Sequence, residues 1–174
     1  MMPHDGSAIP ALCQALAVAL QRRGWMMATA ESCTGGLIAG ACTDLSGSSQ
    51  WFERGFVTYS NQAKTELLGV DPRVLQREGA VSDAVVRAMV QGAVHHAPVQ
   101  VAVAVTGVAG PTGGSADKPV GTVWFGWNVD GQVCSELRHF PGDRADVRRA
   151  TVQHALERLL AMLGDAKTTL GHGH

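Results

Sequence analysis

The chain has 174 residues, a formal net charge of −1, 45% apolar residues and 17% charged residues. This balance is typical of one compact globular domain without a disorder signature, and the length suffices to bury a core without metal or disulfide staples. The near-neutral charge and an aromatic content of only 5% exclude the basic face of a nucleic-acid binder and disfavour base stacking on single strands.

The sequence carries no signal for export or membrane insertion. No apolar run reaches the length of a membrane span, and the first residues lack a basic stretch followed by an apolar one. The four cysteines form no C-x-x-C pair and have no histidine at a zinc-like spacing. We therefore expect reduced thiols, no metal site, no membrane partner and a cytoplasmic location.

The N-terminal half alternates between helical and strand-like patterns, which is typical of an α/β fold. In chain order we predict a helix over 9–23, a buried strand over 25–30, a helix from 35 to about 46, a strand over 51–59, a helix over 61–68 and a short helix opening at Asp71-Pro72. Proline suits the first position of that last helix. Glu53-Arg54-Gly55 weaken the middle of the second strand.

The C-terminal half supplies the remaining elements. In chain order they are a helix capped by Ser82 and running to about 96, a strand over 99–105, a Gly/Pro-rich loop over 106–119, strands over 120–129 and 132–140, and an amphipathic helix capped by Asp143. Valine and alanine dominate 99–105, as in a central strand buried on both faces. Asp130-Gly131 predicts a hairpin. The expected fold is a three-layer α/β/α sandwich with a five-stranded mixed sheet and one antiparallel strand.

A serine-containing turn follows the first predicted strand. Ser32 lies in Glu31-Ser32-Cys33-Thr34-Gly35-Gly36, at the strand end where ligands collect in open α/β sheets. The amides of residues 34–36 open a helix and are expected to face a developing oxyanion. A plain helix cap with glycines for tight packing explains the same residues equally well. Cys33 is a rival nucleophile, but no histidine has a sequence context that recommends it as a partner.

The segment Tyr59-Ser60-Asn61-Gln62-Ala63-Lys64 offers activating partners for the serine. Tyr59 is the only tyrosine and ends a predicted strand, and Lys64 follows in the next helix, so both are expected to point into one cleft. A desolvated lysine has a lowered pKa and accepts the serine proton, and a tyrosine hydroxyl relays that proton or orients the lysine. From spacing alone, a solvated lysine and a packed edge tyrosine are the simpler interpretation.

Further motifs follow in a fixed order along the chain. They are Ala30-Glu31-Ser32-Cys33-Thr34-Gly35-Gly36-Leu37-Ile38-Ala39, then Gly47-Ser48-Ser49 with Tyr59-Ser60-Asn61-x-x-Lys64 and Leu68-Gly69-Val70, then Gly79-Ala80-Val81-Ser82 with Val103-Ala104-Val105-Thr106-Gly107-Val108-Ala109-Gly110-Pro111, and finally Lys118-Pro119-Val120-Gly121-Thr122-Val123. Together, over about residues 9 to 163, they resemble the CinA C-terminal-domain family. The resemblance is to its stand-alone form, without the extra N-terminal domain of longer relatives.

This resemblance implies a single amidohydrolase domain over 1–174 that deamidates nicotinamide mononucleotide (NMN) to nicotinic acid mononucleotide and ammonia in pyridine nucleotide salvage. It implies Ser32 as the nucleophile and Tyr59 and Lys64 as its activating partners. It also implies a homodimer without metal or organic cofactor. Two alternatives stay open: an amidase of a different substrate on the same scaffold, and a catalytically silent nucleotide-binding or regulatory protein.

Several residues are candidates for holding the substrate. The loop Thr106-Gly107-Val108-Ala109-Gly110-Pro111-Thr112-Gly113-Gly114 offers backbone N–H groups to the phosphate, or is only a flexible connector. Arg144 or Arg148 would neutralise the phosphate, although arginines that start a helix more often lie in solvent. Glu31 would orient the pyridinium ring or the carboxamide, or accept structural hydrogen bonds. Asn61 would orient the carboxamide, or cap the helix after Ser60.

Overall fold

A computed structural model describes residues 5–170 of the protein and the side chains of residues 5–164. Residues 1–4 and 171–174 of the predicted domain therefore lie outside the described residues. In chain order the elements are α1 (Ile9–Arg23), β1 (Met27–Glu31), α2 (Leu37–Thr43), the short 3₁₀ helix η1 (Ser48–Gln50), β2 (Phe52–Val57), α3 (Asn61–Leu68), α4 (Pro72–Glu78), α5 (Asp83–His95), β3 (Val101–Gly107), β4 (Thr122–Val129), β5 (Gln132–His139) and α6 (Arg144–Leu170).

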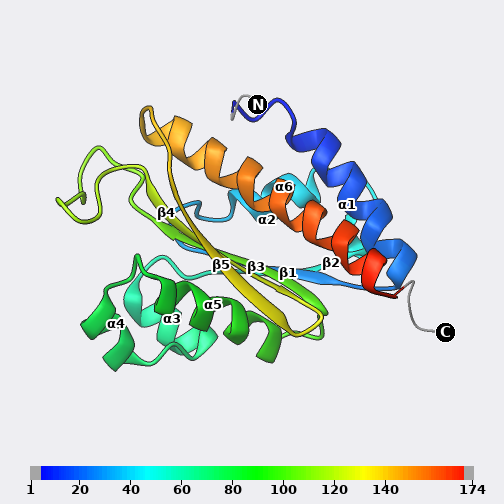
Figure 1. Ribbon diagram of the computed structural model, residues 1–174, viewed down its shortest axis with the longest axis horizontal. Helices are drawn as coiled ribbons and strands as arrows, with labels where there is room; N and C mark the ends of the chain where they lie inside the picture. Colours follow the sequence, from blue (N-terminus) through cyan, green and yellow to red (C-terminus); the bar gives the residue numbers. More distant parts are fainter. Residues whose placement is uncertain (1–4, 171–174) are drawn as a thin grey trace.

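The strands form one five-stranded sheet in the order β2-β1-β3-β4-β5. Strands β2, β1 and β3 are parallel, and β4 runs against both β3 and β5. Helices α1, α2 and α6 cover one face of the sheet, and α3, α4 and α5 cover the other (Figure 1). The predicted three-layer sandwich with a single reversed strand is confirmed.

Strand β3 lies at the centre of the core. Its valines Val101, Val103 and Val105 pack into the cluster formed with α1, α2 and α6. Ala102 and Ala104 point to the opposite face, where they pack with α5. Successive side chains of a strand point to opposite faces, so this alternation buries the strand on both sides, as its composition predicts.

The connections of the sheet create a topological switch point between β1 and β3. The chain leaves β1 through α2 on one face to reach β2, and it returns through α3, α4 and α5 on the other face to reach β3 (Figure 1). The loops after β1 and β3 therefore diverge to opposite faces, although the two strands are neighbours. Ligands of open α/β sheets bind in the crevice at the carboxyl ends of such a strand pair.

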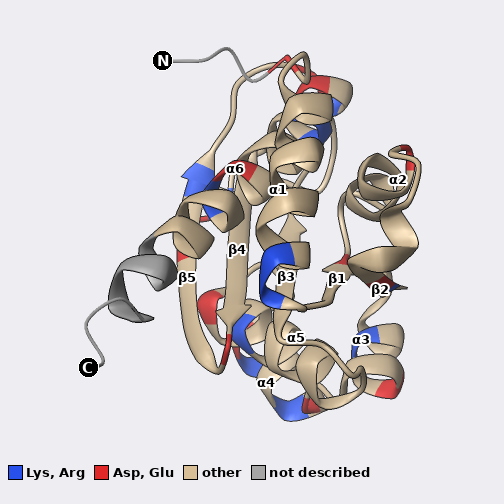
Figure 2. Ribbon diagram, turned by 90° about the vertical axis from the view of Figure 1, so that its right-hand side faces the viewer, with Lys and Arg blue, Asp and Glu red and all other residues tan. Residues whose placement is uncertain are grey.

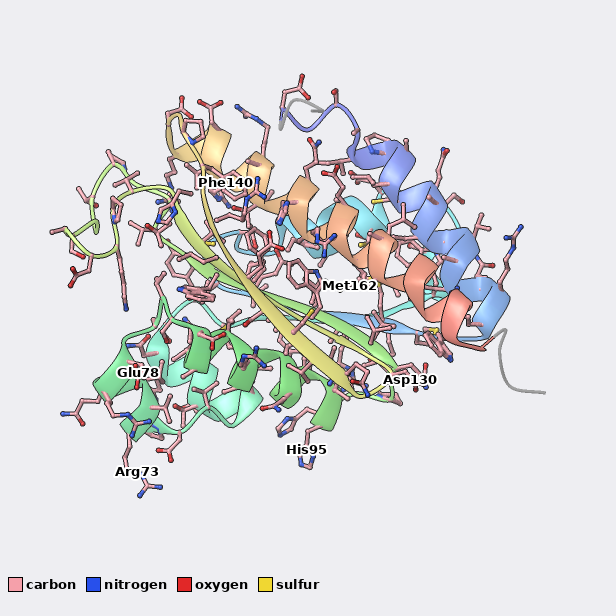
Figure 3. The ribbon with its side chains drawn as sticks, in the orientation of Figure 1. Arg73, Glu78, His95, Asp130, Phe140 and Met162 are labelled. Carbon is pink, nitrogen blue, oxygen red and sulfur yellow. The ribbon has the colours of Figure 1, made fainter. Side chains whose placement is uncertain are left out.

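Local sequence signals account for several element boundaries. Ser60 Oγ accepts a hydrogen bond from the Ala63 amide at 3.0 Å, and Ser82 Oγ accepts one from the Val85 amide at 3.3 Å, so both serines cap their helices. The hairpin turns at Asp130, which lies at its tip (Figure 3), with a φ of 49°. The predicted Ser82 cap and the hairpin are confirmed, whereas the cap of α3 is Ser60 and not the suggested Asn61.

Several boundaries differ from the sequence prediction. Strands β1, β3 and β4 each begin two residues later than predicted, and two further differences bear on the site. The helix expected from residue 35 begins only at Leu37, because Gly35 and Gly36 adopt φ values of 57° and 105° that no helix contains. The strand predicted over 51–59 begins at Phe52 and ends at Val57, and the Thr58 amide still donates to the Glu31 carbonyl at 2.8 Å.

Among residues 5–164, the charged side chains other than Glu31 and Lys64 are not buried. Both signs are spread over the helices and loops, whereas β3 and β4 carry none (Figure 2). Among the described helices, none combines the length and apolarity needed to cross a membrane.

Candidate active site

Three strand ends meet at one edge of the sheet. Ser32 directly follows β1, Tyr59 follows β2 by one further residue, and Thr106 and Gly107 end β3. A cavity of about 210 Å³ opens there. Its lining residues are Ser32, Cys33, Tyr59, Asn61, Lys64, Ala80, Val81, Thr106, Gly107, Ala109 and Arg144. The cavity occupies the crevice that the switch point predicts.

Lys64 is buried beside the serine. Its side chain enters from the first turns of α3 and is only 1% exposed. Its Nζ lies 2.9 Å from Ser32 Oγ, 2.9 Å from the Thr58 carbonyl oxygen and 3.3 Å from the Tyr59 carbonyl oxygen. Burial disfavours the charged ammonium and so lowers the pKa of Lys64.

The three neighbours of Lys64 Nζ define its hydrogen-bonding geometry. The Thr58 and Tyr59 carbonyl oxygens can only accept hydrogen bonds, so two N–H bonds of Lys64 point at them. The remaining tetrahedral position faces Ser32 Oγ. In the neutral amine that position holds the lone pair. A lone pair in that position can accept a proton from the serine hydroxyl.

Tyr59 contacts the lysine through its backbone and a different residue through its hydroxyl. The side chain is 62% exposed. Its hydroxyl accepts a hydrogen bond of 3.1 Å from Arg144 Nη2, and Arg144 Nη1 also donates to the Gly110 carbonyl at 2.9 Å. Arg144 therefore joins the start of α6 to the Tyr59 side chain and to the loop after β3.

Cys33 lines the same cavity but is a weak nucleophile there. The residue is 7% exposed, and burial raises the pKa of its thiol to about 12. The thiolate is the reactive form, so a thiol of this pKa is inert near neutral pH. Among the described residues, no histidine lines the cavity, and His95 lies at the end of α5 and points away from the sheet (Figure 3).

Glu31 and Thr34 were expected to hold substrate, and the structure gives them another role. The Glu31 carboxylate is fully buried and accepts hydrogen bonds from Thr34 Oγ1 at 2.5 Å and from the Ile38 and Ala39 amides at 2.8 and 3.0 Å. Neither residue lines the cavity. Because a helix N-terminus leaves amides unpaired, an acidic side chain is its natural partner, and Glu31 fills this position for α2.

The two glycines of the serine turn also have structural roles. The Gly35 amide donates to the Ser32 carbonyl at 3.1 Å, so it cannot face an oxyanion as we expected. Gly36 occupies the N-cap position of α2, and the next free amides of that helix bind Glu31. Within residues 5–170, the amides of Cys33 and Thr34 make no hydrogen bond to another residue. The Gly36 amide makes none in this part of the chain either, so the free donors near Ser32 are the amides of Cys33, Thr34 and Gly36.

The loop after β3 contributes in part. Thr106 and Gly107 line the cavity from the end of β3, and Thr106 Oγ1 donates to the Ala80 carbonyl at 3.0 Å. Gly110 lies outside the lining and meets the site only through Arg144. Asn61 also lines the cavity, and its predicted alternative role as helix cap belongs to Ser60.

A second, larger cavity adjoins the first. It has a volume of about 670 Å³ and shares Ala109 and Arg144 with the serine cavity. Its other lining residues are Pro111, Val120, Gly142, Asp143, Ala145 and Arg148. The cationic side chains therefore lie at the junction and beyond it, on the α6 side.

Sequence reasoning missed part of the site. The Thr58 carbonyl binds Lys64, and Ala80 and Val81 form a wall of the cavity. The motif Gly79-Ala80-Val81-Ser82 was a signal for that wall. No sequence signal marked Thr58, because it acts through its main chain. Within the described residues, no group of three or more His, Cys, Asp or Glu side chains could hold a metal ion.

Comparisons with known proteins identify the family of the chain. The model of the CinA C-terminal domain matches residues 10–163. A protein of Enterobacter agglomerans named nicotinamide-nucleotide amidohydrolase PncC is 55% identical over 83% of this chain and 89% of its own length. The protein of that name from Escherichia coli K12 is 49% identical over 85% and 90% of the two chains. The crystal structure of competence/damage inducible protein CihA from Agrobacterium tumefaciens superposes with a TM-score of 0.87 at 46% identity and covers 91% of this chain and 96% of its own.

Proposed function

Because this chain belongs to the CinA C-terminal domain family, we propose that it is a nicotinamide-nucleotide amidase. It hydrolyses the carboxamide of NMN to nicotinic acid mononucleotide and ammonia. The observation that carries the proposal is the contact of 2.9 Å between Ser32 Oγ and the buried Lys64 Nζ at the base of the cavity. A serine paired with a neutral lysine is an established arrangement for acyl transfer.

The reaction proceeds in two steps through an acyl-enzyme. Lys64 takes the proton of the Ser32 hydroxyl as Oγ attacks the carboxamide carbon. The tetrahedral intermediate collapses with cleavage of the C–N bond, and Lys64 returns the proton to the leaving nitrogen, which departs as ammonia. A water molecule then attacks the ester and gives a proton to Lys64, and that proton restores the serine hydroxyl as the acid product leaves.

Donors beside the serine stabilise the developing oxyanion. The proposed donors are the amides of Cys33 and Thr34, which are free of other residues in the described part of the chain. Tyr59 assists Lys64 through its carbonyl oxygen, which orients the amine. Its hydroxyl accepts a hydrogen bond from Arg144 and so helps to hold that arginine in position for the substrate.

The two adjoining cavities divide the substrate between them. The carboxamide enters the smaller cavity, where Asn61 and the end of β3 at Thr106 and Gly107 orient it. The ribose phosphate extends toward the larger cavity past Arg144, which is the charged side chain at their junction. The lining residues of the smaller cavity that the structure describes include Arg144 and no carboxylate, so recognition is proposed to depend on the anionic end of the nucleotide.

In the cell, this activity places the protein in cytoplasmic pyridine nucleotide salvage. We further propose a homodimer. Exposed apolar side chains near the free edge of the sheet support it: Val57 of the edge strand β2 is 47% exposed, and Leu37 at the start of α2 is 42% exposed. Sedimentation of the purified protein tests the assembly, and a monomer at micromolar concentration would contradict it.

The decisive experiment incubates the purified protein with NMN and follows ammonia and nicotinic acid mononucleotide together. Equal amounts of the two products, and none with Ser32→Ala, support the proposal. NMN binding in calorimetry without turnover would identify a silent nucleotide-binding protein. Equal rates on simple amides and on NMN would identify an amidase of a different substrate.

A further inference from the structure

A side chain of α6 reaches the backbone of the serine turn. Arg148 donates from Nε to the Cys33 carbonyl at 3.2 Å and from Nη2 to the Thr34 carbonyl at 3.1 Å. A Cβ built on Gly35 would lie 3.5 Å from Arg148 Nη2. The guanidinium therefore lies directly against the turn.

Other hydrogen bonds hold both ends of this turn. At its start, the Ser32 amide donates to the Val105 carbonyl at 3.1 Å. At its end, the Leu37 amide donates to the Thr34 carbonyl at 3.1 Å, and the Glu31 carboxylate binds Thr34 Oγ1. The middle of the turn lacks such bonds between backbone groups. Within residues 5–170, the one group that donates a hydrogen bond to the Cys33 carbonyl is Arg148.

The position of this contact matters because Cys33 directly follows the nucleophile. The Cys33 carbonyl belongs to the peptide plane that also carries the Thr34 amide, one of the proposed oxyanion donors, and the Thr34 carbonyl belongs to the next plane of the turn. Arg148 holds both planes with two separate N–H groups of one planar fork, which a lysine cannot reproduce. Arg148 also lines the larger cavity, so direct contact with the substrate phosphate is the competing role.

We infer that Arg148 is a positioning residue: it holds the Cys33-Thr34 backbone so that Ser32 Oγ stays within reach of Lys64 Nζ. The inference rests on the proposed function, in which Ser32 is the nucleophile. Arg148 acts through the turn and not on the carboxamide, because it does not line the serine cavity. A displacement of about 1 Å at a reacting atom lowers a rate by about 100-fold, so loss of this contact should affect kcat.

The test compares Arg148→Met and Arg148→Lys with the control Arg149→Met. Arg149 is the next residue of α6, is about half exposed and pairs with Asp146. Two measurements are made on folded protein: kcat and KM for NMN, and the rate at which a fluorophosphonate labels Ser32. The probe carries no nucleotide, so its rate reports the serine geometry without the phosphate site.

The inference expects Arg148→Met to lower both kcat and the labelling rate by about 10- to 100-fold with little change in KM. Arg148→Lys should restore neither fully, even if only this variant folds well enough to assay, and Arg149→Met should match the wild type. A raised KM with normal kcat and normal labelling would overturn the inference and make Arg148 a phosphate ligand. If the probe labels Ser32 of the wild-type protein but the protein does not hydrolyse NMN, the proposed substrate is wrong, and the labelling rates of the variants still test the role of Arg148. If wild-type protein does neither, Ser32 is not an activated nucleophile and the inference falls with it.

Discussion

Lys64 Nζ and Ser32 Oγ lie 2.9 Å apart in a place where the lysine side chain is 1% exposed. No carboxylate is hydrogen-bonded to that amine; its other neighbours are the carbonyl oxygens of Thr58 and Tyr59. Burial without a neutralising anion favours the uncharged amine, and an uncharged amine can act as a base. The chemistry of the site follows from this pair.

The pH dependence of activity should follow the titration of Lys64. Burial lowers its pKa from the ordinary lysine value, and only the neutral form accepts the serine proton. We expect kcat/KM for NMN to rise with pH through a single ionisation below the ordinary lysine range and then to level off. A profile that falls across the same range would contradict a neutral lysine base.

The lowered pKa of Lys64 should also make the free energy of unfolding depend on pH. Between the lowered pKa in the folded state and the ordinary value in the unfolded state, the unfolded chain binds more protons, so the contribution of Lys64 makes the free energy of unfolding rise with pH. Below the folded pKa the penalty for burying the ammonium is complete. Urea unfolding at a series of pH values should show this rise in the wild type, and Lys64→Met should lack it.

Replacement of the serine and of its neighbouring cysteine should separate the two candidate nucleophiles. We expect Ser32→Ala to lower kcat by at least about 1,000-fold, since loss of a nucleophile is the largest single effect in such sites. Cys33→Ala should stay within a few-fold of the wild type, because burial raises the pKa of the Cys33 thiol to about 12. The reverse pattern in steady-state assays would make Cys33 the nucleophile.

Glu31→Gln should destabilise the fold. The buried carboxylate accepts three hydrogen bonds, and an amide group would turn one N–H toward another donor. We expect a loss of about 1–3 kcal/mol in the free energy of unfolding, measured by urea denaturation. Glu66→Gln, on the exposed side of α3, is the control. If Glu31→Gln is as stable as the wild type and only its KM is raised, Glu31 binds the substrate and the structural role is wrong.

Tyr59 and Arg144 should affect binding more than chemistry. Tyr59→Phe keeps the carbonyl that holds Lys64 and removes only the hydroxyl bound to Arg144, so kcat should fall far less than in Lys64→Met. Arg144→Met should raise KM for NMN by about 10- to 100-fold, the value of a charged hydrogen bond, and leave KM for a neutral amide unchanged. If Tyr59→Phe is as inactive as Lys64→Met, its hydroxyl takes part in proton transfer.

Local patterns predicted most of the fold. The helix over 61–68 has its predicted limits because Ser60 caps it and Gly69 ends it with a φ of 71°. The valine and alanine alternation of β3 places each side chain on its observed face. Side-chain period and cap chemistry depend on neighbours within a few residues, so a single sequence carries this information.

The site was predictable only in part, for the same reason. The strand-end rule brings Ser32, Tyr59 and Lys64 to one edge of the sheet, where the structure has them. The role of Glu31 depended on where α2 begins, and Gly35 and Gly36 shift that start to Leu37. Arg148 meets residues more than 100 positions earlier in the chain, and no local pattern encodes such a contact.

The reach of α6 onto the serine turn also has a consequence for biosynthesis. The last helix supplies Arg144 and Arg148, whose contacts span 34 to 115 residues of sequence. Contacts between such distant segments form late, because closing long loops costs entropy before packing compensates for it. A ribosome-bound chain that lacks α6 would therefore hold its serine and lysine without the final restraint on the turn. Hydrolytic activity should thus appear only when α6 has been synthesised and has docked.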